Sequence, residues 1–324
     1  MFRDALVVGK FYPFHRGHKY LIETALSQSE RVTVFVFEKP EQTISGELRR
    51  AWIKATHPSA EVIVVDDKLP DDDSQAWAEE TIRILKRHPD VVFSSEDYGA
   101  RYAACMGAQH VLVDQQRIRV PISARQIRAA PLGHLEFLEP IVRAYFVKRV
   151  CIVGAESTGS TTLARALAQS LQTVWVPEYG RTYSEGKFEC GEYSRWDTEE
   201  FVHIASTQCA MEDELAKRAN KVLICDTNAF ATCLWHERYM ECWSEEVEAI
   251  GRGRKYDLYL LTDIDIAFTQ DGMRDGESIR DWMHHRFVSE LEKRRLPYAL
   301  LSGPRETRMR SALQLIGELV AASS

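Results

Sequence analysis

Two histidines near the start of the chain are the side chains best placed to do chemistry. His15 and His18 lie in the run Gly9-Lys10-Phe11-Tyr12-Pro13-Phe14-His15-Arg16-Gly17-His18, between an apolar run over 5–8 and an amphipathic helical pattern. A turn from a buried strand into a helix leaves backbone N–H groups and the positive helix end available to a phosphate. Gly17 also allows a phosphate to approach the backbone closely. The pattern therefore predicts that both imidazoles face a bound phosphate rather than only hydrogen-bonding a loop.

A second glycine-rich turn follows another apolar run, over 150–153. It matches the phosphate-binding loop G-x-x-x-x-G-K-[ST], except that Ser160 stands in the lysine position. Backbone N–H groups of such a loop still hold phosphate, but the cation that reaches the β- and γ-phosphates is missing. Thr161 is the candidate Mg²⁺ ligand of this loop. The candidate ATP-binding residues here are Gly154, Glu156, Ser157, Thr158, Gly159, Ser160, Thr161 and Thr162.

Several later residues could complete this second site. Asp226 ends an apolar run and suits a metal contact of the Walker B type. Arg274 and Arg280 belong to a segment that could close over a nucleotide as a mobile lid. Arg165 lies one turn into the helix and is expected to point away from the loop. We therefore expect a lid arginine, rather than Arg165, to replace the lysine.

A short turn over 177–181 carries a carboxylate and a guanidinium. Glu178 and Arg181 are candidates for binding the hydroxyl groups of a ribose, and Asp226 is a further candidate for that role. A surface salt bridge is the alternative interpretation of Glu178 and Arg181.

Strand and helix patterns alternate along the chain, which favours parallel sheets with crossover helices. The first half has strand patterns at 32–37, 61–65, 91–93 and 110–113 and helical patterns at 47–55, 75–87 and 99–106. Periodicity is lost over 129–148, and strand patterns then return at 150–153, 221–225 and 256–261. We therefore predict an α/β protein with two domains, residues 1–140 and residues 148–324.

Composition narrows the class of protein further. The chain has 324 residues, 45% of them hydrophobic and 27% charged, as in ordinary soluble globular proteins. A net charge of -7 gives no general basic surface, so we expect no nucleic-acid partner. The longest apolar runs are too short to cross a membrane, and no cleavable signal pattern opens the chain. Seven scattered cysteines without a C-x-x-C pair argue against a disulfide framework, so we predict a cytoplasmic protein.

The first turn resembles the G-x-F-x-P-x-H-x-G-H signature of the HxGH nucleotidylyltransferases, and residues 122–128 (I-S-A-R-Q-I-R) resemble the I-S-x-x-x-I-R segment of that family. The resemblance implies a Rossmann-like fold and transfer of a nucleotidyl group from ATP, with Mg²⁺ bridging phosphate oxygens. Because the substrate's own phosphate is the attacking group, positioning and charge stabilisation would carry the catalysis.

The resemblance also implies roles for individual residues. His15 and His18 would contact the triphosphate near the reacting phosphorus, while Ser123 and Arg128 would hold the departing phosphates. His15, His18 and Arg128 are thus the expected catalytic residues. Gly9 and Phe11 come with the first motif, and Arg125 stands where the family usually has Thr or Ser. Ser123 is in addition expected to cap a helix.

Two further features resemble the nicotinamide mononucleotide adenylyltransferases. Arg49-Arg50-Ala51-Trp52 is similar to the R-x-x-W segment of that family, and Trp77 is similar to its loop tryptophan. A tryptophan face suits the positively charged nicotinamide ring. The resemblance therefore implies that Arg49 and Trp77 bind nicotinamide mononucleotide, with Ser95 near the adenine or ribose. Another acceptor, such as phosphopantetheine, is the alternative, and the choice between amidated and deamidated mononucleotide stays open.

The second half resembles the ribosylnicotinamide kinase part of the bifunctional NadR-type proteins. The resemblance rests on residues 178–183 (E-Y-G-R-x-Y), 226–232 (D-T-x-x-F-x-T) and 271–274 (D-G-x-R), together with the linker over 140–149. It implies a P-loop kinase-like α/β fold. Asn228 stands where family members often carry Asp. No helix-turn-helix pattern precedes the first motif, so we expect no repressor function.

Taken together, these resemblances imply an enzyme of NAD biosynthesis and salvage. The first domain would transfer AMP from ATP to nicotinamide mononucleotide, and the second would bind ATP and phosphorylate nicotinamide riboside. Because the lysine is missing, a non-catalytic nucleotide-sensing second domain is the alternative. Kinase activity, assembly into a homo-oligomer and coupling between the two sites stay open.

Overall fold

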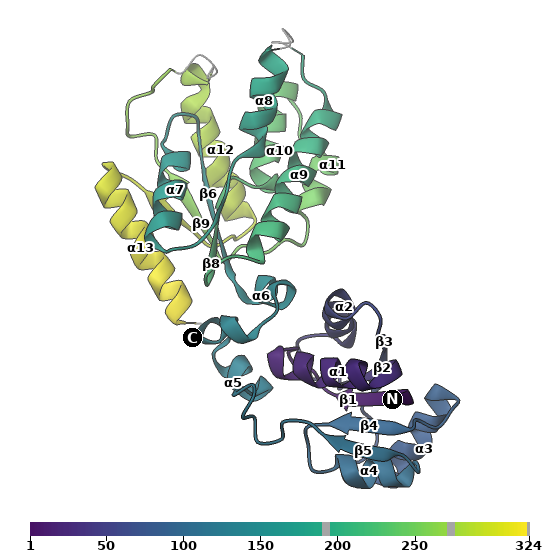
Figure 1. Ribbon diagram of the computed structural model, residues 1–324. Coiled ribbons are helices and arrows are strands. Elements are labelled where there is room, and N and C mark those ends of the chain that lie inside the picture. The colour runs from purple at the N-terminus through teal and green to yellow at the C-terminus, as the bar shows by residue number, and fades with distance from the viewer. Residues whose placement is uncertain (190–194, 271–275, 323–324) are drawn as a thin grey trace. The chain divides into compact units, whose positions relative to one another are not determined.

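The computed structural model describes residues 1–189, 195–270 and 276–322. The chain forms two compact units, Met1–Val142 and Arg143–Ser324, and the expected limits of 140 and 148 lie on either side of this division. Both units are built on five-stranded parallel sheets with helices on both faces (Figure 1). The expected α/β fold with two successive parallel sheets is therefore confirmed.

The sheet of the first unit has the strand order β3-β2-β1-β4-β5. Its strands are β1 (Phe2–Gly9), β2 (Ser29–Glu38), β3 (Glu61–Asp66), β4 (Val91–Ser94) and β5 (Gln109–Leu112), and its main helices are α1 (Arg16–Gln28), α2 (Gly46–Thr56), α3 (Ser74–Leu85) and α4 (Gly99–Cys105). Strand β1 lies at the centre, which explains its unbroken apolar run: both of its faces are covered. Leu6, Phe35 and Val92 pack there against α3 and α4.

The chain leaves β1 at a point where the strand order reverses. Strand β2 pairs with one side of β1 and β4 with the other, both in parallel register. In open parallel sheets, ligands bind in the crevice outside the carboxyl ends of the strands at such a reversal. The turn that carries His15 and His18 therefore lies where the fold favours a ligand.

The segment between the two units is more ordered than its sequence suggests. It contains α5 (Ala124–Ala129), two short 3₁₀ turns, η1 (Pro131–Gly133) and η2 (Leu135–Phe137), and α6 (Pro140–Phe146). The segment over 129–148, whose sequence shows no clear periodicity, thus still forms short helices. Pro131 and Pro140 lie in the first turns of helices, where proline costs no hydrogen bond.

The second unit has the strand order β10-β9-β6-β8-β7. Its strands are β6 (Lys148–Gly154), β7 (Trp175–Val176), β8 (Val222–Asp226), β9 (Leu258–Thr262) and β10 (Tyr298–Leu301). Its helices are α7 (Ser160–Ser170), α8 (Tyr179–Glu189), α9 (Thr198–Ala216), α10 (Ala229–Met240), α11 (Glu245–Gly251), the 3₁₀ turn η3 (Glu277–Ile279), α12 (Arg280–Lys293) and α13 (Arg305–Ala321). Strands β7 and β10 were not expected from the sequence.

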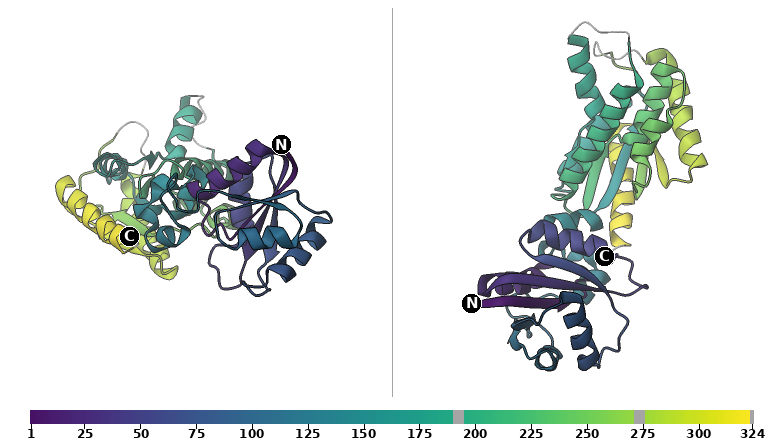
Figure 2. Two further views of the ribbon diagram at one scale, coloured as in Figure 1. Left: turned by 60° about the horizontal axis from the view of Figure 1, so that its bottom comes forward. Right: turned by 90° about the vertical axis from the view of Figure 1, so that its right-hand side faces the viewer.

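Two helix layers cover the second sheet. Helices α7 and α13 lie on one face, where Ile152, Leu163 and Ile316 share a core (Figure 1). Helices α9, α10 and α11 pack together on the other face around Phe201 and Val247, as the turned views of Figure 2 also show. Within the described residues, no helix combines the length and the apolar character that crossing a bilayer would require.

Candidate functional site

A cavity of about 670 Å³ opens at the carboxyl end of β1. Its lining includes every residue predicted for the first site except Arg49 and Trp77. The predicted residues that line it are Gly9, Phe11, His15, His18, Ser95, Ser123, Arg125 and Arg128. Residues that are more than a hundred positions apart in the sequence are thus brought together at one sheet edge.

The two histidines form a stacked pair in the wall of this cavity. Their ring centroids lie 3.7 Å apart with an interplanar angle of 26°. His15 Nδ1 accepts a hydrogen bond from the Gly17 backbone N–H over 3.1 Å and so caps helix α1. Because Nδ1 accepts this bond, the ring proton of neutral His15 lies on Nε2. Phe11 packs edge-on against His18, with ring centroids 4.9 Å apart.

Both imidazoles are neutral at pH 7. Burial lowers the pKa of His15 to about 4, and the nearby Arg117 guanidinium acts in the same direction. Burial, followed by the adjacent His15, lowers the pKa of His18 well below its ordinary value. Nδ1 of His18 is buried and makes no hydrogen bond to the described residues. Neutral rings of this kind can donate hydrogen bonds to phosphate oxygens without a change of protonation state.

The second motif supplies a hydroxyl and a guanidinium to the same cavity. Ser123 caps α5 in a reciprocal arrangement with Gln126: Ser123 Oγ accepts the Gln126 N–H, and Gln126 Oε1 accepts the Ser123 N–H. The cap expected at Ser123 is therefore present. Arg128 lies with its guanidinium 4.8 Å above the Tyr12 ring and donates to the Tyr12 carbonyl. This contact ties the second motif to the first.

Arg49 lies elsewhere than the sequence predicts. Its side chain is 0% exposed and donates to the backbone carbonyls of Lys10, Phe37 and Ser45 and to the side chain of Gln42. Arg49 lines neither the cavity described above nor the smaller cavity beside it that contains Trp77. The R-x-x-W pattern places Arg49 on α2 but does not say which way that face of the helix points. In this structure Arg49 holds the loop after β1, and its contact with the mononucleotide stays a prediction.

Trp77 lines a smaller cavity of about 190 Å³ next to the first one. Gly9, Lys10 and Tyr98 line both cavities, so the two adjoin at the end of β1. The indole Nε1 donates to the Pro70 carbonyl over 3.0 Å, and Phe37 packs against the ring with centroids 4.8 Å apart. The tryptophan is thus held in a fixed orientation beside the histidine-lined cavity.

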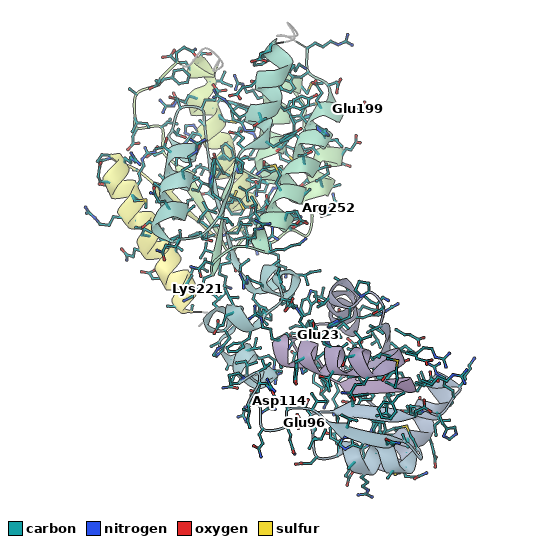
Figure 3. The ribbon with its side chains drawn as sticks, viewed as in Figure 1. Glu23, Glu96, Asp114, Glu199, Lys221 and Arg252 are labelled. Carbon is teal, nitrogen blue, oxygen red and sulfur yellow. The ribbon has the colours of Figure 1, made fainter. Side chains whose placement is uncertain are left out.

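Sequence reasoning missed Arg117, which lines the larger cavity and acts electrostatically on both histidines. It lies in a loop that Asp114 organises by accepting three backbone N–H groups, those of residues 118–120. Glu96, from the loop after β4, lies 3.6 Å from the Arg117 guanidinium, and Figure 3 labels Glu96 and Asp114 at this end of the sheet. No motif marks this loop, because its function depends on the fold bringing it back to β1.

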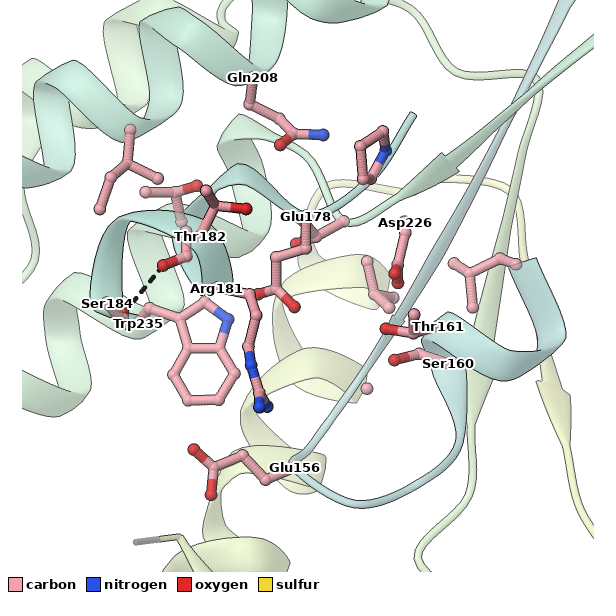
Figure 4. Close-up of a pocket in the computed structure, with 18 of the residues that line it drawn as sticks. Glu156, Ser160, Thr161, Glu178, Arg181, Thr182, Ser184, Gln208, Asp226 and Trp235 are labelled. Atoms are coloured by element: carbon pink, nitrogen blue, oxygen red, sulfur yellow. Dashed lines mark hydrogen bonds between the residues drawn. The ribbon is translucent and has the colours of Figure 1, made fainter. Parts of the chain in front are cut away.

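The second unit has its own cavity, of about 540 Å³, at the carboxyl ends of β6, β7 and β8 (Figure 4). The predicted residues that line it are Gly154, Glu156, Ser157, Ser160, Thr161, Thr162, Glu178, Arg181 and Asp226. Thr158 and Gly159 are not in the lining and shape the loop instead. Thr158 is buried and bonds the Ala155 carbonyl and the Thr262 hydroxyl, both at 2.7 Å, while Gly159 adopts a φ of 81° before α7. A side chain at Gly154 would come within 2.1 Å of the Thr262 hydroxyl.

Thr161 and Asp226 fit a divalent cation. Burial raises the pKa of the Asp226 carboxyl, and a hydrogen bond from Thr161 opposes that shift. Oδ2 of Asp226 is buried and has no hydrogen-bond partner among the described residues. Among the described residues, no group of three or more His, Cys, Asp or Glu side chains is arranged so that it could hold a metal ion. A hydroxyl and one carboxylate match Mg²⁺, which binds few protein oxygens and takes the rest from phosphate and water.

Glu178 follows β7 and shares the cavity with Asp226 (Figure 4). Burial raises the pKa of its carboxyl to about 8, with repulsion from Asp226 adding to the shift and Arg181 opposing it. Two carboxyl groups in one cavity, with their pKa values pushed upward, are typical of sites that handle protons.

We expected a lid arginine to replace the missing lysine, but the lid arginine that the structure describes does not line the cavity. Arg280 donates to the carbonyls of Ile266 (2.8 Å) and Ser157 (3.2 Å) and is not in the cavity lining. Arg274 lies outside the described residues. Arg165, expected to point away, does line the cavity, with its guanidinium 4.9 Å over the Trp175 ring.

An aromatic wall completes this cavity and was also missed. It consists of Trp175, Phe188, Trp196, Phe201, Trp235, Tyr239 and Phe287. Trp196 and Tyr239 pack with ring centroids 5.3 Å apart. These residues come from β7, α8, α9, α10, α12 and the residues before α9, so no local sequence pattern groups them. Their faces suit a planar or cationic ring.

Comparisons with known proteins agree with the division of the chain into two units. Residues 149–308 match the family described as AAA domain, and residues 4–68 match the family described as citrate lyase ligase C-terminal domain. Among curated proteins, the chain is 27% identical over 342 aligned residues to the trifunctional NAD biosynthesis/regulator protein NadR of Escherichia coli (strain K12), covering 97% of this chain and 83% of that protein. It is 29% identical over 304 residues to the protein of the same name from Salmonella typhimurium, covering 85% and 72%.

Solved structures give the same result for the fold. A NadR protein in complex with NR has a TM-score of 0.80 at 22% identity, covering 98% of this chain and 96% of that one. A NadR protein in complex with NAD and AMP-PNP has a TM-score of 0.78 at 21% identity, covering 99% and 97%. The chain is thus similar to NadR proteins in sequence and in fold over nearly its whole length, which confirms the resemblance that its motifs indicate.

Proposed function

We propose that the first unit transfers AMP from ATP to nicotinamide mononucleotide, giving NAD and pyrophosphate. The observation that carries this proposal is the convergence of His15, His18 and Arg128 on one cavity at the end of β1. The similar proteins are named for NAD biosynthesis, and one of them was solved with NAD and AMP-PNP. These names support the nicotinamide substrate over another acceptor phosphate.

The reaction places simple demands on the protein. A phosphate oxygen of the mononucleotide attacks the α-phosphorus of ATP, the bond from that phosphorus to the β-phosphate oxygen breaks, and pyrophosphate leaves. His15 and His18 would donate hydrogen bonds to oxygens around the reacting phosphorus, since both rings are neutral. Arg117 and Arg128 line the same cavity and would offset charge on the departing phosphates.

The nicotinamide ring is proposed to bind in the smaller cavity against Trp77, whose orientation is fixed by Pro70 and Phe37. Arg49 would act indirectly, by holding the Lys10 carbonyl and hence the loop between the two cavities. Ser95, in the lining of the larger cavity, stays a prediction for the adenosine side.

The test is formation of NAD from ATP and nicotinamide mononucleotide by the full chain, with the deamidated mononucleotide assayed separately. His18→Ala should lower kcat by about 100-fold or more, which is typical for loss of a donor at a reacting phosphate. His134→Ala is the matched control, because His134 lies outside both cavities of the first unit and packs near Phe137. Comparable rates for the wild type and His18→Ala would overturn the assignment.

A second activity is favoured by the cavity of the second unit. We propose that it phosphorylates nicotinamide riboside, the source of the mononucleotide. The observation in favour is the pair Glu178 and Asp226 beside the phosphate-binding loop, facing an aromatic wall. One similar structure was solved with NR.

In this reaction the 5′-hydroxyl oxygen of the riboside attacks the γ-phosphorus of ATP, its proton passes to the Glu178 carboxylate, and ADP leaves. Thr161 and Asp226 would hold Mg²⁺, which neutralises phosphate charge when bound. The backbone of the loop would cradle the phosphates, and the aromatic wall would pack on the nicotinamide ring.

The rival hypothesis is a second unit that only senses nucleotides. The two are separated in a His18→Ala background, where mononucleotide made by the second unit cannot proceed to NAD. Formation of ADP and nicotinamide mononucleotide from ATP and riboside supports the kinase, whereas ATP binding without turnover supports the sensor. Use of Mg²⁺ in particular, a cytoplasmic location and self-assembly stay predictions.

A further inference from the structure

The phosphate-binding loop of the second unit lacks the cation that such loops normally carry. Ser160 and Thr161 present only hydroxyl groups at the start of α7, and both line the cavity. Transfer of a phosphoryl group spreads negative charge over the transferred oxygens, and cationic groups beside it contribute strongly to the rate. Another residue of this chain should therefore bring positive charge to that position.

Three arginines near the loop contact the loop itself and so hold its shape. Arg238 pairs with the Glu156 carboxylate over 3.0 Å. Arg280 donates to the Ser157 carbonyl, and Arg308 donates to the Thr158 carbonyl over 2.9 Å while pairing with Asp265. Arg280 and Arg308 contact backbone carbonyls of the loop, so their positive ends are directed at the protein and not at a ligand.

Among the described residues that line the cavity, the arginines and lysines are Arg165 and Arg181. Arg165 stacks on Trp175, at 4.9 Å, and its charge acts on Asp226. That contact places it beside the metal ligand rather than over the loop.

Arg181 is placed differently. It lies in the first turn of α8, where its Nε donates to Glu185 over 2.8 Å. Figure 4 shows its side chain extending into the cavity between Glu178 and Glu156, on the side opposite Ser160 and Thr161. The charge of Arg181 also acts on Glu178, so its guanidinium lies close to the group that would take the proton from the riboside.

We propose that Arg181 supplies the positive charge that Ser160 cannot, by donating hydrogen bonds to oxygens of the transferred phosphoryl group. The inference rests on the proposed riboside phosphorylation and assigns Arg181 to the phosphate rather than to the ribose. The reaction is unchanged: the riboside oxygen bonds to the γ-phosphorus, the bond to the β-phosphate oxygen breaks, the proton goes to Glu178, and Arg181 keeps all its protons.

The experiment measures riboside phosphorylation by the full-length chain carrying Arg181→Ala, Arg181→Lys, Ser160→Lys or the double change Arg181→Ala with Ser160→Lys. Arg165→Ala is the comparison variant, because Arg165 is the other arginine of the described cavity lining. Arg181→Ala should lower kcat by about 100-fold or more with a smaller effect on the KM for riboside. Arg181→Lys should retain more activity than Arg181→Ala, because it keeps the charge. Hydrogen exchange in peptides from β6 and β8, measured on the same samples, reports whether the second unit of each variant is folded.

The double variant is the decisive arm. A lysine at position 160 should raise kcat at least tenfold in the Arg181→Ala background and by a smaller factor in the wild type, because the two cations would serve the same oxygens. Equal factors in both backgrounds would overturn the proposal. So would a loss in Arg181→Ala that is confined to the KM for riboside, or a larger loss of kcat in Arg165→Ala. A wild-type chain that binds ATP without phosphorylating the riboside would overturn the kinase function itself, an outcome distinct from these.

Discussion

Acidification should weaken the first unit through His15, and the size of the effect follows from its surroundings. Burial lowers the pKa of His15 to about 4, while the same side chain in an unfolded chain titrates near ~6.5. Between these two values the unfolded state binds more protons than the folded state. The free energy of unfolding is therefore unaffected above about pH 6.5 and falls as the pH drops toward 4.

The magnitude can be worked out from the same values. From pH 7 to pH 5, His15 alone should lower the free energy of unfolding of the first unit by about 2 kcal/mol, at roughly 1.4 kcal/mol per pH unit. In the folded state the added proton would go to Nδ1 and break the hydrogen bond from the Gly17 N–H, a cost that the lowered pKa already includes. His18, whose pKa is also lowered by burial, adds to the effect.

His15→Asn is the matched variant. Asparagine is a good helix N-cap and does not titrate, so it keeps the cap while removing the proton-binding group. Urea unfolding at pH 7 and pH 5, followed by hydrogen exchange in peptides from β1 and α1, measures the first unit by itself. We expect His15→Asn to lose about 2 kcal/mol less than the wild type on acidification. The same loss in both proteins would refute the reasoning.

Three other changes test the remaining parts of the structure. Arg49→Ala should lower the free energy of unfolding of the first unit, measured with urea, by about 3–5 kcal/mol. The reason is that the change leaves buried carbonyl groups without their hydrogen-bond donor. A decrease of less than about 1 kcal/mol would contradict the role of Arg49 under the loop. Glu178→Gln should abolish riboside phosphorylation. In the wild type, kcat/KM should rise with pH by up to about tenfold per pH unit below the raised pKa of Glu178, because only the ionised carboxylate accepts the proton. A flat profile of kcat/KM from pH 6 to 8 would exclude Glu178 as the base. Gly154→Ala should abolish ATP binding by the second unit in calorimetry while sparing NAD formation, since the added methyl group would meet the Thr262 hydroxyl; unchanged ATP affinity would show that the loop tolerates the group.

The sequence predicts the two phosphate-binding turns well because each is local. A strand, a short turn and a helix lie within some twenty residues, so spacing alone puts His15 or Thr161 at a helix start. Long apolar strands such as β2 and β6 were recognised for the same reason. Strand β7 has only two residues, and β10 is a short edge strand with Leu300 exposed, so neither carries a clear pattern.

Two features could not be predicted from the sequence: the direction in which a side chain points, and which distant loops come together in the fold. Arg49 and Arg128 are both arginines in motifs, yet one is buried under the loop after β1 and the other lines the cavity. Arg117 reaches the histidines only because β5 lies beside β4. Trp196 lies just before α9 and Trp235 lies on α10, and only the packing of these two helices shows that both residues line one cavity.

The division between the two units falls inside a helix, and this matters for anyone who wants to cut the chain. Helix α6 runs from Pro140 to Phe146, whereas the change from one unit to the other lies between Val142 and Arg143. Truncating the chain there would leave each fragment with half of α6, whose backbone N–H and C=O groups would lack helical partners. Separate fragments should instead end before Pro140 and begin with the strand at Lys148, so that neither carries part of α6.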